Sequence, residues 1–137
     1  MTHDALKQEL EEVGTTGIQK VLFDFSEILN IDLNKAYPLV FWDIDNSSFI
    51  KNFRDSTQLV TMDVFILDLF NDDEDKKITK WDELETVFDA YINLVNAKEF
   101  ISIPEMTNIA KELYPPGIIS VDNEVGMRYR VTLKLHC

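Results

Sequence analysis

The sequence is poor in the residues that hold covalently linked or metal-bound folds together. Its 137 residues include one cysteine, Cys137, and two histidines, His3 and His136. A single cysteine excludes an internal disulfide, and without a Cys-x-x-Cys pair a structural zinc site is also excluded. Because these three residues stand at the two ends of the chain, we expect them to be tail residues without a catalytic role, and we expect no cofactor.

Glycine, proline and long apolar runs are scarce as well. The chain has four glycines and four prolines beside 45% hydrophobic and 11% aromatic residues, a composition that excludes collagen-like and wholly disordered proteins. No stretch approaches 18 consecutive apolar residues, and the first four residues form neither a basic leader nor an apolar signal core. We therefore expect a single globular domain over residues 1–137, with no membrane span and no secretion.

Positive charge is also in short supply. Thirteen Lys and Arg against 25 Asp and Glu give a net charge of -12, which repels phosphate and disfavours sequence-specific nucleic-acid binding. Residues 1–110 hold nine basic and 22 acidic residues (net -13), whereas residues 111–137 hold four and three (net +1). Two interpretations follow. Arg128, Arg130 and Lys134 either contact the acidic part of a neighbouring subunit or pair with acids of their own fold.

Hydrophobic periodicity predicts an α+β fold. The predicted helices lie at 6–13, 18–29 and 79–97, the last of them capped by Thr79, and a short helix or turn is predicted at 104–113. The predicted strands lie at 39–44, 59–70, 117–121 and 127–135, and the second of these is expected to be long, central and largely buried. We expect an antiparallel sheet of about four strands packed against helices on one face.

The same patterns predict which side chains are buried. In residues 127–135 apolar and polar residues alternate strictly, so one face of this strand should be buried and the other exposed. Trp42, Trp81 and Tyr91 fall on the predicted apolar faces and are expected to be core aromatics. Paired carboxylates for hydrolysis are the one enzymatic option, but solvent or edge exposure is the expected state of the strand acids Asp43, Asp45, Asp63 and Asp68.

The polar segment Asp45–Gln58 is the strongest candidate for an interaction surface. It carries three apolar residues that a solvated loop does not explain, Phe49, Ile50 and Phe53, and Arg54 follows them. We expect a long hairpin arm or a loop. Its aromatics either pack on a neighbouring subunit or fold back onto their own core.

An acidic run is the one candidate for cation binding. Asn71, Asp73, Asp75 and Asp82 occupy positions 1, 3, 5 and 12 of a calcium-loop register. Lys76 stands where that loop requires glycine, and a β-rich segment precedes the run instead of a helix. A solvated connection whose acids favour the positive N-terminus of the next helix is the competing interpretation.

Taken together, the pattern resembles the tail terminator and tail completion proteins of tailed bacteriophages. The resemblance rests on the N-terminal helix, the segment Tyr37-Pro38-Leu39-Val40, the polar arm, the long strand at 59–70, the helix from Thr79 and the hairpin 118–135. It implies a non-enzymatic virion subunit, assembled in the host bacterial cytoplasm, that forms a ring through which DNA passes and that contacts neighbouring connector or tail proteins. The alternative is a small monomeric acidic adaptor that docks one partner protein, and self-association discriminates the two.

Overall fold

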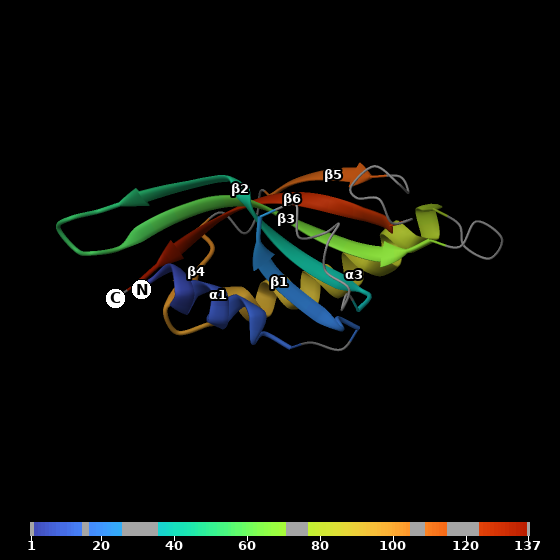
Figure 1. The fold of residues 1–137 in the computed structure, drawn as a ribbon, viewed down its shortest axis with the longest axis horizontal. Helices are drawn as coiled ribbons and strands as arrows, with labels where there is room; N and C mark the ends of the chain where they lie inside the picture. Colours follow the sequence, from blue (N-terminus) through green and yellow to red (C-terminus); the bar gives the residue numbers. More distant parts are fainter. Residues whose placement is uncertain are drawn as a thin grey trace.

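A six-stranded mixed sheet and two helices make up the described part of the computed structural model (Figure 1). The structure describes residues 2–14, 17–25, 36–70, 77–104, 109–114 and 124–136. In chain order the elements are α1 (His3–Glu11), β1 (Lys20–Asp24), β2 (Leu39–Lys51), β3 (Gln58–Leu69), α3 (Lys77–Asn96), β4 (Ile101–Ser102), β5 (Ala110–Tyr114) and β6 (Glu124–Leu135). The expected α+β class is confirmed.

The sheet differs from the expected antiparallel sheet of four strands. Its order is β1-β2-β3-β6-β4, β5 also pairs with β6, and β1 runs parallel to β2. The long strand predicted at 59–70 is confirmed as β3, which lies at the centre of this order. β6 is likewise confirmed as a strand with one buried face, and the first strand of its predicted hairpin (117–121) lies outside the described residues.

One predicted helix is wrong, and a second predicted segment also forms a strand. The segment predicted as a helix at 18–29 contains β1, because its apolar residues Val21, Leu22 and Phe23 pair with β2. A short apolar run of this kind fits a strand as well as a helix until its partner is known. The segment predicted as a short helix or turn at 104–113 ends instead in β5, which runs along the edge of β6 with mostly exposed side chains. An edge strand without a buried face does not need alternating apolar and polar residues, so its sequence lacks the usual signal of a strand.

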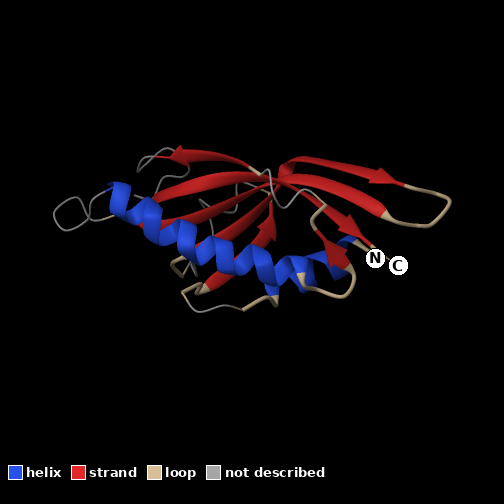
Figure 2. Ribbon diagram, turned by 180° about the vertical axis from the view of Figure 1, so that it is seen from behind, coloured by secondary structure: helices blue, strands red, loops and turns tan. Residues whose placement is uncertain are grey.

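The main core lies between the helices and one face of the sheet (Figure 2). α1 begins at Thr2, whose hydroxyl accepts a hydrogen bond from the backbone N–H of Ala5 at 3.1 Å. Residues from both helices meet side chains from the facing strands, and the largest buried members are Trp42, Tyr91, Phe88, Leu6 and Leu10. Trp42 and Tyr91 are thus core aromatics as predicted, whereas Trp81 is only half-buried. The predicted cap at Thr79 is wrong because α3 already begins at Lys77.

A wide irregularity in β2 sets the shape of the sheet. Asp43 lies opposite Asp63, but the next pair is Ser48 opposite Thr61, so residues 44–47 of β2 face Met62 alone. Inserting residues into one strand bends it and increases its twist. Beyond this bulge, β2 and β3 continue as a hairpin whose tip projects past α1 and the two termini (Figure 1). The β3 strand of this hairpin also pairs with the end of β6, from Thr61 opposite Thr132 to Gln58 opposite Leu135.

Candidate interaction surface

The projecting hairpin, residues 48–61, is the arm. Its strands pair from Ser48 opposite Thr61 to Lys51 opposite Gln58, so the predicted arm is a hairpin and β2 is longer than the strand predicted at 39–44. At its tip, Asn52 donates its backbone N–H to the carbonyl of Thr57 at 2.9 Å. The Asp55 carboxylate accepts hydrogen bonds from the Thr57 backbone N–H at 3.0 Å and from its hydroxyl at 2.7 Å. These bonds hold the pKa of Asp55 below its usual value. They also fix the conformation of the turn at the tip of the hairpin.

Apolar side chains of the arm face solvent. Phe53 at the tip is 88% exposed and Ile50 is 63% exposed, while Phe49 and Leu59 are each a little over a third exposed. Phe49 partly packs on its own chain, because its ring meets the His3 ring edge-on at 4.9 Å. The Lys51 ammonium lies 5.6 Å from the Phe53 ring centre. Exposed apolar groups clustered on a projecting element are typical of a surface that another molecule covers.

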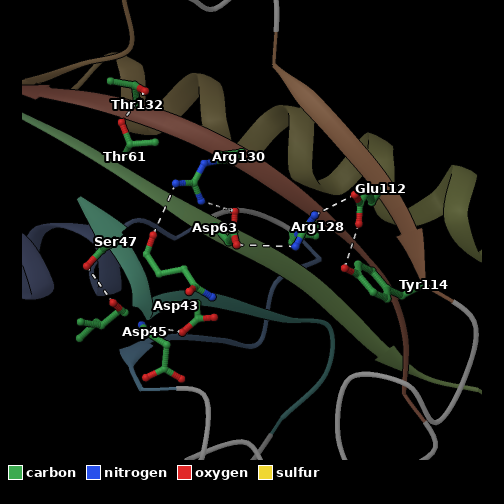
Figure 3. A network of polar contacts seen from close by, with 12 residues as sticks. Asp43, Asp45, Ser47, Thr61, Asp63, Glu112, Tyr114, Arg128, Arg130 and Thr132 are labelled. Carbon is green, nitrogen blue, oxygen red and sulfur yellow. Dashed lines mark hydrogen bonds and ion pairs between the residues drawn. The ribbon is translucent and has the colours of Figure 1, made fainter. Parts of the chain in front are cut away.

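The sheet face away from the helices carries a network of charges around Asp63 (Figure 3). The Asp63 carboxylate lies 3.0 Å from the guanidinium of Arg130 and 3.8 Å from that of Arg128. Arg128 extends to Glu112 on β5 at 2.8 Å, and Tyr114 donates its hydroxyl to the same Glu112 at 3.0 Å. Two of the three C-terminal cations predicted as candidate interface residues are therefore paired within their own fold. Lys134 instead lines a 240 Å³ cavity under the arm, together with Ile50, Leu59 and Asp55.

The predicted exposure of the strand acids is wrong for two of them. Asp43 and Asp63 are opposite each other on β2 and β3, and both are buried. Asp45 is exposed, as predicted, and Asp68 is half-buried with the Lys80 ammonium 3.0 Å away. The facing arginines of β6 make burial of Asp63 tolerable, and these partners lie more than sixty residues away in the sequence.

Asp43 is the buried acid with a perturbed pKa in this network. Burial raises its pKa, the hydrogen bond from the Asp45 backbone N–H opposes that rise, and the charges of Asp45 and Asp63 add to it. A carboxyl whose folded pKa exceeds its unfolded pKa binds its proton more tightly in the folded state. Its ionisation therefore lowers stability as pH rises from the unfolded pKa through the folded pKa, and the loss persists above it.

A second surface feature is a cleft between α3 and the strands β5 and β6. It has a volume of about 440 Å³ and is lined by Glu85, Phe88, Asp89, Ile92, Asn93, Ile109, Lys111 and Tyr129. Phe88 and Tyr129 stack at its floor with ring centres 4.0 Å apart. Glu85 pairs with Lys111 across the cleft at 3.0 Å. Sequence reasoning missed this cleft because the segment that contains β5 was predicted as a short helix or turn.

The two histidines are part of the fold, so the prediction that they are tail residues is wrong. His3 opens α1 and packs on Phe49, and the His136 ring lies 3.0 Å from the hydroxyl of Ser102 on β4. Cys137 lies outside the described residues, as do three of the four residues considered for calcium, Asn71, Asp73 and Asp75. Within the ranges that the structure describes, no group of three or more His, Cys, Asp or Glu is arranged to hold a metal ion. None of the helices described in the structure is long and apolar enough to cross a membrane.

Comparison with known proteins adds no relative: the sequence matches no protein-family model and no curated protein. Function is therefore argued from three features of the structure: the exposed arm, the acidic cleft and the sheet face whose charges are paired internally.

Proposed function

We propose that the protein is a non-enzymatic subunit of an oligomeric ring at the head-to-tail or tail-end joint of a tailed bacteriophage, with DNA passing through the ring. The arm supports this proposal most directly. It projects from the body of the molecule, its turn is held by hydrogen bonds, and it presents Phe53 and Ile50 to solvent. An ordered apolar projection gains stability by burying these groups against a neighbouring protein.

The charge of the chain supports a passage for DNA rather than a binding site for it. A net charge of -12 repels the phosphate backbone, whereas tight binding needs unpaired Lys or Arg against phosphates. Arg128 and Arg130 are both engaged by acids of the same chain, which lowers their availability for such contacts. A lumen lined by this protein would let DNA slide. Salt-dependent DNA binding with a Lys or Arg footprint would contradict that part of the proposal.

Self-association is the property to test. The mass of the purified protein, measured by light scattering and native mass spectrometry over a range of concentration and salt, should reveal a discrete ring-sized oligomer, alone or with connector and tail proteins of a tailed phage. Phe53→Ser should weaken assembly without changing thermal stability, since the side chain is 88% exposed. Leu94→Ser is a matched control, because Leu94 is an exposed apolar residue of α3 away from the arm.

A protein that stays monomeric alone and with such partners contradicts the ring proposal. That outcome favours the second class of function, a monomeric acidic adaptor that uses its arm to dock one partner protein. Equal loss of assembly in the Phe53 and Leu94 variants would show that general surface hydrophobicity, rather than the arm, drives association.

A further inference from the structure

We propose that the arm of one copy docks into the cleft of a second copy, with Phe53 entering between α3 and β5 and with Arg54 facing Asp89. The inference rests on the proposed function, because it specifies how the ring subunits would join. It commits to a second copy of this chain as the occupant of the cleft. The two surfaces match in apolar character, in charge and in position.

The cleft has an apolar floor and acidic walls. Phe88, Ile92 and Tyr129 at its base are each at most 6% exposed, while Asp89 stands at the rim. The volume of about 440 Å³ falls in the range of roughly 300 to 1,000 Å³ typical of sites that enclose a ligand group. Partial burial raises the pKa of Asp89, the nearby Glu85 charge raises it further, and Lys111 opposes the rise. A cation brought to this rim would relieve that unfavourable environment.

The arm has the complementary composition. Residues 48–58 contain Lys51 and Arg54 against Asp55 alone, a net charge of +1 in a chain whose total is -12. Lys134 adds a further positive charge beneath the arm, where it lines the cavity with Asp55. Phe53 stands at the tip between these cations. The arm is thus an apolar group with a positive rim, set on an acidic protein.

The charge of α3 favours this pairing over contact between two arms. From Trp81 to Asn96 the helix carries four acids, Asp82, Glu83, Glu85 and Asp89, and no Lys or Arg. Lys111 offsets one of these charges at the cleft. A contact between two arms would bring positive groups together, and their repulsion disfavours it. A contact between an arm and a cleft brings opposite charges together.

The positions of the two surfaces explain why the partner is another copy. The β3 strand of the arm pairs with the end of β6, from Thr132 to Leu135, whereas β5, which borders the cleft, pairs with the opposite half of β6 from Arg130 to Gly126. The tip projects away from the body on the far side from β5 (Figure 1). One chain therefore presents its arm and its cleft to two different neighbours. Such a head-to-tail contact closes into a ring when the rotation between copies permits it.

Charge reversal tests the pairing without disturbing the core, because all substituted side chains are exposed. The variants are Arg54→Glu on the arm, Asp89→Lys at the cleft, the two combined in one chain, and Asp82→Lys as a matched control on α3 outside the cleft lining. Assembly is followed by light scattering and native mass spectrometry at low and high salt. Thermal melting confirms that each variant is folded.

Each single reversal at the contact should weaken self-association by about tenfold or more, and Asp82→Lys should weaken it much less. The combined variant should recover assembly. An equal mixture of the two single variants should also recover it, because each arm then meets a cleft of opposite charge. Loss of assembly in Asp89→Lys, together with recovery in the mixture, distinguishes an arm-to-cleft contact from an arm-to-arm contact, because Asp89 takes no part in the latter.

Two different failures are separable. If Arg54→Glu loses assembly while Asp89→Lys assembles like the wild type, or if neither the mixture nor the combined variant recovers, the arm docks elsewhere and this inference is overturned while the ring proposal stands. If the wild-type protein never self-associates, alone or with phage connector and tail proteins, both the ring proposal and the arm-to-cleft contact are overturned.

Discussion

Removing one hydroxyl group from the core tests how α1, α3 and the sheet are held together. The Tyr91 hydroxyl on α3 accepts a hydrogen bond from the indole Nε1 of Trp42 at 2.9 Å and donates one to the carbonyl oxygen of Leu10 at 3.0 Å. All three residues are fully buried. Burial raises the pKa of Tyr91, so the hydroxyl keeps its proton and remains a donor at neutral pH. One group thus links β2, α3 and the last turn of α1.

Tyr91→Phe keeps the ring and removes both bonds. A buried donor left without a partner costs about 1 to 3 kcal/mol, and the lost bond to Leu10 adds about 0.5 to 1.5 kcal/mol. We therefore expect the free energy of unfolding to fall by about 2 to 4 kcal/mol. With a urea m-value of about 1 to 3 kcal/mol/M, the midpoint of unfolding should fall by about 1 to 2 M.

Urea unfolding followed by tryptophan fluorescence measures this loss. Tyr114→Phe is the matched control, since that hydroxyl donates a single bond to an exposed glutamate and its removal should change stability by about 0.5 kcal/mol or less. In a double-mutant cycle with Trp42→Phe, the two losses should be non-additive by about 1 kcal/mol, because the second change removes a group that has already lost its partner. Equal stability of the Tyr91 and Tyr114 variants would refute the reasoning.

Three further predictions concern the sheet. Asp43→Asn should raise the urea midpoint at pH 7, because it removes a carboxyl whose folded pKa is raised. This gain should disappear as pH falls toward 4, and a gain independent of pH would contradict a raised pKa for Asp43. Arg130→Ala should lower the free energy of unfolding by about 1 to 3 kcal/mol in urea titrations and leave the oligomer mass unchanged, since this cation pairs inside its own fold; lost assembly without lost stability would argue for an interface role. Gly126→Ala should lower the melting temperature strongly because an added Cβ would lie 2.1 Å from a backbone carbonyl of β3, whereas Gly14→Ala, with nothing within 4 Å, should not.

The sequence predicted best those elements whose signal is local. The helical spacing of Leu84, Phe88, Tyr91 and Val95 predicts α3 nearly to its last residue, and strict alternation predicts the buried face of β6. The arm was one of two structures predicted for the segment 45–58, a hairpin or a loop, because its apolar residues stand within a polar stretch. These features depend on residues close together in the chain.

The errors lie where a distant segment decides the outcome. β1 is a strand because β2 offers it a parallel partner, and β5 is a strand because the edge of β6 is open to it. The burial of Asp63 has the same origin, since its partner Arg130 is contributed by another strand. A carboxylate in a β-rich segment carries no local sign of whether a guanidinium will face it.

The sequence alone therefore determined the fold class, the elements α3, β3 and β6, the acidic charge and an apolar cluster within the polar segment 45–58, all of which follow from composition and short-range periodicity. Tertiary structure decided the parallel edge strand, the internal pairing of Arg128 and Arg130, and the cleft beneath β5. Each of these depends on contacts between residues far apart in the chain, whose energies of burial and charge pairing exist only once the strands have been brought side by side.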